Sequence, residues 1–347
     1  FEPVFMEAAG PQPTCYDVAA GRMTDDASYG AAYAERVLDG MRWWYADPDL
    51  PGGGVGMAYD EAVAALDSAA VLINVGGSCW APEFERAPRR VLVDTDAPFT
   101  QLRLADGDTS FAGLVDRHDT LATYAVHVVD GTARTPDGGR TWLPTRPPVH
   151  LPSVEVTPVP DGSWTTVTSW SSYGARWWDL EEYRQKDVSY MSIGDLPSKV
   201  DGVRLELALS GDGPVRQLEK RGWHIVDPTP VTLTPQAFTG YLQGSRGELG
   251  VTKQAYTKAR TGAFNDRTLM YAASGRPVVC SDTGLDWLPT GQGVLPFTDL
   301  ASAAEAILQV EADPQAHGAA ARRIAEEHFA ADRVVRDLLT AAGVPLP

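Results

Sequence analysis

The clearest indication of the fold is the segment RTGAFNDRTLMYAASGRPVVCSDTGLD, residues 260–286. Asn265 or Asp266 is expected to cap a helix, because a short polar side chain accepts hydrogen bonds from the free N–H groups of a first turn. Gly275 is expected to end that helix, since helices often leave through a left-handed residue. The apolar run at 278–280 then predicts a strand that is covered on both faces. The stretch therefore predicts one helix–strand unit of an α/β sheet.

Two places in this stretch are suited to a ligand. Loop 281–286 leaves the strand at its carboxyl end, where open α/β sheets bind ligands. The helix start combines free N–H groups, the positive end of the helix dipole and the guanidinium of Arg267, which together suit a phosphate. An ordinary helix–strand unit with its usual cap explains the same residues without a ligand.

Helices and strands are expected to alternate along the rest of the chain, as in parallel sheets with crossover helices. In the first half we expect strands at 1–6, 70–75 and 90–94, helices at 29–41 and 60–69, and a flexible loop at 51–56. In the second half we expect strands at 165–169, 203–209 and 222–226 and helices at 299–311 and 314–341. The helix at 299–311 is predicted to bury Leu300, Ala303, Ala304, Ile307 and Leu308.

The proline-rich passage at 144–160 predicts a linker, because proline removes ladder hydrogen bonds from a central strand. A chain of 347 residues also fits two domains of roughly 150–200 residues. We therefore predict domains at 1–150 and 151–347. Loops 171–174, 210–213 and 281–286 are expected to face a cleft between them.

Composition limits the partners of the protein. The net charge is −17, and the five lysines all lie at or beyond Lys186, so nucleic acid is not an expected partner. No apolar run is long enough for a membrane span and no signal peptide is visible, so we expect no stable membrane insertion. Three widely spaced cysteines favour a reducing, cytoplasmic location. The six histidines show no metal-binding spacing, and we expect no bound metal.

Further segments occur in an order typical of one family: VLVDTDAPFTQ (91–101), WLPTRPPV (142–149), TTVTSWSSYG (165–174), RQKDV (184–188) and SRGEL (245–249). With 260–286 they resemble glycosyltransferases of the GT-B fold, and they are most similar to a bacterial group near the spore-maturation glycosyltransferases. The resemblance covers most of the chain. It implies two Rossmann-like domains facing across a cleft, with the N-terminal domain lacking its first strand and helix. Abundant alanine and arginine with few lysines also favour a bacterial source.

The resemblance implies transfer of a sugar, as in a hexosyltransferase, from a nucleoside diphosphate sugar (UDP- or TDP-sugar) to a small-molecule or glycan acceptor, without metal or other cofactor. Arg267 and Lys186 are the candidate cations for the departing diphosphate, and Asp94 and Asp96 are candidates for the general base or acceptor contacts. The other candidate donor-binding residues are Ser171, Ser172, Glu248, Lys253, Arg260, Asn265, Asp266, Thr268, Asp282, Thr283 and Gly284. Trp80, Phe84 and Phe99 are candidates for an apolar acceptor wall.

Alternatives remain at this point. Each charged candidate is also explained as a surface charge, turn or cap, and Glu248 as a helix-start glutamate. Many retaining enzymes of this fold carry two glutamates at the places held here by Gly262 and Met270, so the stereochemical outcome stays open. A sugar-nucleotide epimerase of the same fold and a degenerate nucleotide-sugar-binding protein are the competing functions. A nicotinamide dehydrogenase is disfavoured because no GxGxxG follows an early strand. The sequence does not specify an oligomeric state.

Overall fold

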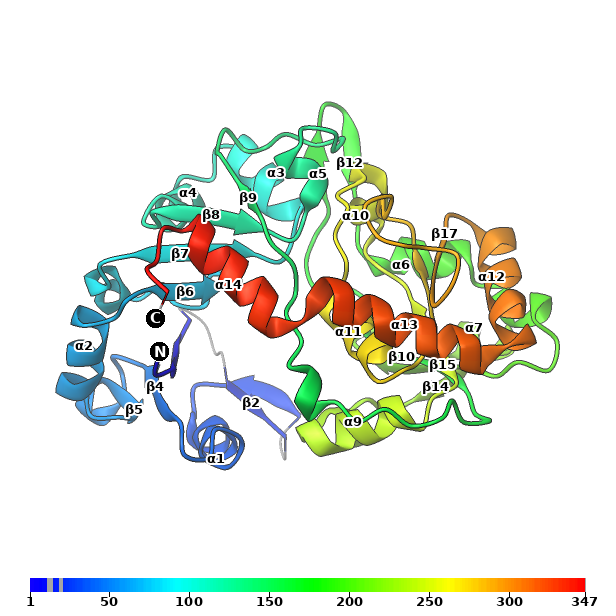
Figure 1. The fold of residues 1–347 in the computed structure, drawn as a ribbon, viewed down its shortest axis with the longest axis horizontal. Coiled ribbons are helices and arrows are strands. Elements are labelled where there is room, and N and C mark those ends of the chain that lie inside the picture. Colours follow the sequence, from blue (N-terminus) through cyan, green and yellow to red (C-terminus); the bar gives the residue numbers. More distant parts are fainter. Residues whose placement is uncertain (11–14, 19–20, 347) are drawn as a thin grey trace. The chain divides into compact units, whose positions relative to one another are not determined.

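The structure is a computed structural model that describes residues 1–10, 15–18 and 21–346 (Figure 1). The chain forms two compact units. Unit 1 comprises residues 1–95, 109–122 and 339–347, and unit 2 comprises residues 96–108 and 123–338. This division differs from the predicted ranges 1–150 and 151–347, and whether those ranges are independent domains stays a prediction.

Unit 1 holds the short strands of the first third of the chain. β1 (Val4–Ala8) pairs in parallel with β4 (Arg42–Ala46), and β5 (Gly54–Gly56) pairs antiparallel to β4. In a second sheet, β6 (Leu72–Val75) pairs in parallel with β7 (Arg90–Asp94), which is followed in the sheet order by β8 (Thr120–Thr123). The remaining elements are β2 (Cys15–Asp17), β3 (Arg22–Thr24), α1 (Ser28–Val37), η1 (Pro51–Gly53), α2 (Tyr59–Asp67), η2 (Pro82–Arg86) and α4 (Thr109–Val115).

The glycine run at 51–56 is not the flexible loop that we predicted. It forms η1 and then β5, which adds to the edge of β4. A Cβ atom at Gly54 would lie 2.2 Å from the carbonyl oxygen of Tyr45, so only glycine lets the two strands approach this closely. The run is therefore explained by strand pairing and needs no ligand.

Unit 2 is built on a six-stranded parallel sheet in the order β14-β13-β10-β15-β16-β17. Its strands along the chain are β10 (Trp164–Ser169), β13 (Leu205–Ser210), β14 (His224–Val226), β15 (Gly247–Gly250), β16 (Val278–Ser281) and β17 (Val294–Phe297). Numbered within the unit this is the order 3-2-1-4-5-6 of doubly wound dinucleotide-binding sheets. The order reverses between β10 and β15, and ligands of such sheets bind at the carboxyl ends beside that point.

Helices cover both faces of this sheet. One core joins the sheet to α6 (Lys186–Ser192), α7 (Val215–Lys220) and α12 (Leu300–Ala312). The other joins it to α9 (Pro235–Gln243), α11 (Asp266–Ala273) and α13 (Pro314–Phe329). Val279 packs into the first core while Val278 and Cys280 pack into the second, which explains the unbroken apolar run.

The other elements of unit 2 connect or extend this framework. They are α3 (Phe99–Ala105), α5 (Val126–Val129), β9 (Leu143–Pro144), η3 (Leu151–Ser153), β11 (Arg176–Trp178), β12 (Glu181–Tyr183), η4 (Leu196–Lys199), α8 (Thr229–Thr232), α10 (Gln254–Ala259) and α14 (Ala331–Ala341), whose last turn belongs to unit 1. Among the described residues, no helix is both long enough and apolar enough to cross a membrane.

Several local predictions are confirmed. The Asn265 side chain accepts a hydrogen bond from the Arg267 N–H and caps α11. Gly275 follows this helix with a φ of 73°. Because the sheet is parallel, loops 171–174, 210–213 and 281–286 all follow strands at the same edge of unit 2, and that they face a cleft between two domains stays a prediction. The proline-rich passage at 144–160 begins with Pro144, the last residue of β9, and beyond it contains η3 and no further strand.

Two local predictions are wrong. The helix predicted at 314–341 breaks at Ala330, where Val149 forms a parallel bridge: its N–H donates to Phe329 and its carbonyl accepts from Ala331. In α12, Leu308 is 47% exposed, whereas Ala306 and Val310 are buried, so the buried stripe is rotated from the predicted one. The strand β15, which the SRGEL segment enters, was not predicted, and it excludes the alternative of Glu248 as a helix-start glutamate.

Candidate functional site

A buried ion pair marks the point where the strand order of unit 2 reverses. Glu248, in the middle of β15, is 0% exposed. Arg267, in the first turn of α11, donates from Nε to Glu248 Oε1 at 2.6 Å and from Nη1 to the Val167 carbonyl on β10 at 2.9 Å. Arg267 therefore ties together the two strands that flank the switch point. Two residues that we predicted as separate ligand contacts are partners of each other.

This pair keeps spare hydrogen-bonding capacity. Glu248 Oε2 and Arg267 Nη2 are buried and have no hydrogen-bond partner among the described residues, as do the hydroxyls of Thr166 on β10 and Thr252 just after β15. Buried polar groups are normally paired, and leaving one unpaired costs about 1–3 kcal/mol. Several such groups on and beside the two strands that flank the switch point indicate a place built for polar contacts beyond the protein's own.

Lys186, the first residue of α6, supplies a cation to the same region. No hydrogen bond or ion pair joins its ammonium group to any described residue. Burial and the neighbouring cations Arg267 and Lys253 lower its pKa from 10.5 to about 7, against the opposing charges of Glu248 and Asp96. An anion placed here would stabilise the charged amine.

Lys253 is held in an aromatic enclosure. Its ammonium donates to Asp96 Oδ1 at 2.5 Å and to the Tyr173 hydroxyl at 2.6 Å. It also lies 4.5–5.6 Å from the ring centroids of Phe99, Tyr173 and Tyr256, a distance suited to cation–π attraction. Asp96 accepts further hydrogen bonds from the hydroxyls of Tyr173 and Tyr256. These contacts favour a role for Asp96 in positioning Lys253 over a role in removing a proton.

His127, which was not among the candidates, contacts the loop after β16. Its Nε2 lies 2.8 Å from the Gly284 carbonyl and 2.9 Å from Asp286 Oδ1. Its Nδ1 lies 3.1 Å from Asp130 Oδ2 and 2.9 Å from the Thr132 hydroxyl. Burial opposes protonation, but these acceptors and the two carboxylate charges outweigh it and raise the pKa of His127. No pattern in the surrounding sequence, AVHVV, pointed to this contact.

Other predicted loop residues are engaged in shaping the same region. Asp282 Oδ1 accepts from the N–H groups of Gly284 and Leu285, and the Thr283 hydroxyl donates to the Ala263 carbonyl at 2.8 Å. Arg260 donates to Asp286 Oδ2 at 2.7 Å. These contacts fix the loop, and its backbone is held as well: the Asp282 N–H donates to the Phe297 carbonyl, and the Thr283 carbonyl accepts from the Gly262 N–H.

The remaining candidates are spread over the two units. Thr268 is buried in the first turn of α11, where Asp266 is exposed. Ser171 and Ser172 are exposed just after β10. Asp94 is the buried last residue of β7 and belongs to unit 1, whereas Asp96 belongs to unit 2.

The predicted apolar acceptor wall is not formed as expected. Phe84 is buried in the core of unit 1, and Phe99 is buried in a small core of unit 2 with Leu102 and Tyr183. Both rings are used for packing. Trp80 alone of the three is half-buried, and it lines a pocket in unit 1.

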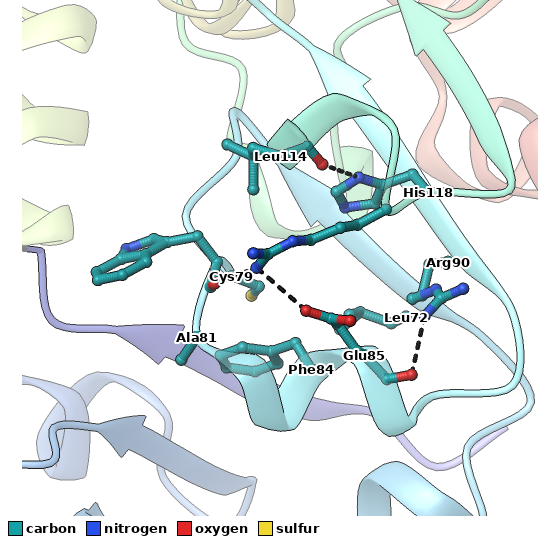
Figure 2. A pocket seen from close by; sticks show the side chains of 10 residues that line it. Leu72, Cys79, Ala81, Phe84, Glu85, Arg90, Leu114 and His118 are labelled. Carbon is teal, nitrogen blue, oxygen red and sulfur yellow. Dashed lines mark hydrogen bonds and ion pairs between the residues drawn. The ribbon is translucent and has the colours of Figure 1, made fainter. Parts of the chain in front are cut away.

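This pocket, shown in Figure 2, lies among β6, η2 and the end of α4. Arg117 pairs with Glu85 at 3.2 Å across it, and His118 Nδ1 lies 3.0 Å from the Leu114 carbonyl. Its empty space of about 220 Å³ includes open solvent, and the enclosed part has room for about one water molecule. The pocket is therefore too small for a sugar.

The described side chains form no metal-binding group. Within residues 1–10, 15–18 and 21–346, no three His, Cys, Asp or Glu side chains are grouped so that they could hold a metal ion. The metal independence expected from the sequence stays a prediction.

Comparisons with solved structures define the fold. The chain is similar to an alpha-glucosyltransferase solved with UDP (13% identity, TM-score 0.57, covering 90% of this chain and 94% of that one). It is also similar to HepE from Anabaena, solved with UDP and glucose (12%, 0.55, 99% and 99%). A third similar structure is AviGT4, a glycosyltransferase of avilamycin A biosynthesis (15%, 0.52, 90% and 86%). The protein therefore has the GT-B glycosyltransferase fold.

The sequence itself gives a narrower match. Residues 204–340 match the family described as glycosyl transferase-like, a range that runs from just before β13 to α14. A search of curated proteins gives no match. The resemblance to the spore-maturation group stays a prediction.

Proposed function

We propose that this protein is a glycosyltransferase that takes a sugar from a nucleoside diphosphate sugar bound at the carboxyl edge of the unit 2 sheet. The observation that carries the proposal is Lys186, an unpaired amine that lies close enough to Arg267 and Lys253 for their charges to lower its pKa. Three cations lie near one another, and only Arg267 and Lys253 have a carboxylate partner. An anionic ligand would balance the remaining charge.

The chemistry of sugar transfer fits these groups. As the glycosidic bond to the donor breaks, negative charge grows on the departing diphosphate. Fixed cations in a partly buried site stabilise that charge more strongly than they would in water. Arg267 Nη2 and Lys186 Nζ are the groups with free donors, while Glu248 keeps the guanidinium in place. We assign Arg267 and Lys186 to the diphosphate and Glu248 to positioning Arg267.

Uridine diphosphate is the preferred nucleotide of this proposal. The glycosyl transferase-like match at 204–340 lies almost entirely in unit 2. Two proteins of similar fold were solved with UDP, one of them together with glucose. We therefore propose a UDP-sugar as the donor and transfer without a metal ion. We propose a small molecule or a glycan as the acceptor.

A thermal-shift screen of UDP-, TDP-, GDP- and ADP-sugars tests the proposal. A ligand at 100 times its Kd stabilises a protein by about 2.7 kcal/mol. UDP-sugars should raise the Tm of the wild-type protein, and Lys186→Met should weaken this binding at least tenfold. Lys199→Met, which changes an exposed lysine on η4, is the matched control. Failure of every nucleotide sugar to bind would refute the proposal, and binding without release of free UDP would make the protein a carrier and not an enzyme.

A further inference from the structure

A β-hairpin in unit 2 exposes an unusual turn. β11 and β12 pair antiparallel and are joined by Asp179 and Leu180, whose φ angles are 49° and 65°. Such two-residue turns need positive φ at both positions and usually contain Asn and Gly. A leucine in this conformation is rare, and Leu180 is 94% exposed. A strained residue whose side chain makes no core contact points to a role for that side chain outside the fold.

The two faces of the hairpin differ. On one face Tyr183 is buried and donates to the Arg134 carbonyl at 2.8 Å, and Arg176 pairs with Asp106 at 3.5 Å. On the other face Trp177 stands opposite Glu182 and is 60% exposed. The first face anchors the hairpin, so the indole of Trp177 is presented on a fixed support.

Charge limits what this surface can bind. The cations around the hairpin are engaged: Arg176 with Asp106, Lys258 with Glu181, and Arg184 with Asp187. Asp179 has no ion pair in the described part of the chain, and Glu182 lies 3.9 Å from Arg184. Phosphorylated or other anionic ligands would therefore meet carboxylates here without a free cation.

An exposed indole beside carboxylates is chemically complementary to a neutral saccharide. The flat apolar face of an indole packs against the C–H face of a sugar ring, and indole N–H groups are hydrogen-bond donors. Carboxylate oxygens accept hydrogen bonds strongly, and sugar hydroxyls can supply them. A neutral saccharide offers both surfaces without bringing a negative charge.

The hairpin is continuous with the proposed donor site. It is part of the segment that joins β10 to α6. Tyr173, before the hairpin, contacts both Lys253 and Asp96. Lys186, after the hairpin, begins α6 and is separated from β12 only by Arg184 and Gln185. A ligand on the outer face of the hairpin would thus lie on a segment whose two ends both belong to the donor site.

We propose that Trp177, Leu180 and Glu182 bind a neutral oligosaccharide, which is the acceptor of the transfer reaction. This inference rests on the proposed function for the role of the saccharide, but the binding itself can be measured alone. The indole stacks on a sugar ring, Glu182 accepts from its hydroxyls, and Leu180 covers the edge of a neighbouring unit.

Fluorine NMR tests this inference directly. The ten tryptophans would be labelled as 5-fluorotryptophan, and Trp177→Phe would assign the Trp177 signal. Neutral linear oligosaccharides of glucose, galactose, mannose and N-acetylglucosamine are then titrated one by one. We expect at least one to shift the Trp177 signal more than that of Trp178, which lies on the anchored face. Trp177→Ala should weaken that binding at least tenfold while leaving UDP binding unchanged.

A second variant guards against effects on folding. Leu180→Asn suits the positive φ of the turn and should fold at least as well as the wild type, yet weaken oligosaccharide binding at least threefold. Leu308→Ala, which removes another exposed leucine of unit 2, should not change it. If no oligosaccharide shifts Trp177, or if only phosphatidylcholine vesicles do so, the inference is overturned while UDP binding still stands. Oligosaccharide binding without UDP binding would instead overturn the proposed function.

Discussion

Replacing Lys186 by methionine should stabilise the ligand-free protein at low pH, although it removes a group proposed for function. The pKa of Lys186 is lowered from 10.5 to about 7, mainly by burial. Below pH 7 the lysine is charged in both the folded and the unfolded protein, so the folded state bears the full cost of the buried charge. Between pH 7 and 10.5 only the unfolded state keeps the proton, and stability therefore rises with pH. Above pH 10.5 the lysine is neutral in both states, so the free-energy cost of the buried charge is absent.

The magnitude follows from the pKa. The full change corresponds to about 5 kcal/mol, and the partial contact of the side chain with solvent reduces this to roughly 2–4 kcal/mol. Urea unfolding at pH 6, 7.5 and 9 should show Lys186→Met more stable than wild type by that amount at pH 6. The difference should shrink at each higher pH. Lys199→Met should follow the wild type throughout. A difference that is the same at all three pH values would refute the reasoning.

Two further predictions concern buried charges in unit 2. Arg267→Ala should lower the free energy of unfolding by about 3–5 kcal/mol, because it leaves the Glu248 carboxylate buried and unpaired. The double variant Glu248→Leu/Arg267→Met should recover most of that loss in urea unfolding but should not bind UDP; a double variant as unstable as the single one would contradict the assigned pairing. The raised pKa of His127 means that its contacts stabilise the protein fully below pH 6.5 and that this contribution is lost as pH rises through the folded-state value. His127→Asn should remove that part of the pH dependence of stability. An unchanged dependence of stability on pH would show that the contact between His127 and Asp286 does not stabilise the protein.

Local sequence patterns were sufficient to predict the elements whose burial or capping depends only on nearby residues. The apolar residues of β16 are covered on both faces, and an unbroken run of such residues can be recognised without knowing its neighbours in the fold. The cap at Asn265 and the exit at Gly275 were predicted because both depend only on nearby backbone groups. These elements, and the carboxyl edge that they define, follow from physics that acts within a few residues.

Other features depend on contacts between distant segments. The strand β15 was missed because its glutamate reads as a surface residue, and only the pairing of Glu248 with Arg267 explains its burial. No proline or glycine lies at the break between α13 and α14. The break occurs where Val149, which is distant in the chain, forms a bridge with Ala330, and so it could not be predicted from the local sequence. The hydrogen-bonding and aromatic contacts of Lys253 come from three separate segments that carry Asp96, Tyr173 and Tyr256.

In the candidate site, too, the residues could be selected from the local sequence, whereas their contacts with distant segments could not. Lys186, Arg267 and Glu248 were selected from the sequence as separate contacts, and the structure brings them within electrostatic reach of one another. The alternative explanation of Arg267 as a surface charge is excluded by its buried ion pair with Glu248. Tyr173 lies in a segment that was already singled out, TTVTSWSSYG, so its place at the end of a predicted strand was the signal available. His127 offered no such signal.

The most direct test of the donor site is the titration of Lys186 with and without UDP. Reductive methylation with ¹³C gives an NMR signal for each lysine, and Lys186→Met identifies the one in question. We predict that this signal titrates near pH 7 in the free protein and that saturating UDP raises the pKa by at least one unit, because the diphosphate stabilises the charged amine. A Lys186 signal that titrates near 10.5 and does not respond to UDP would contradict the central claim.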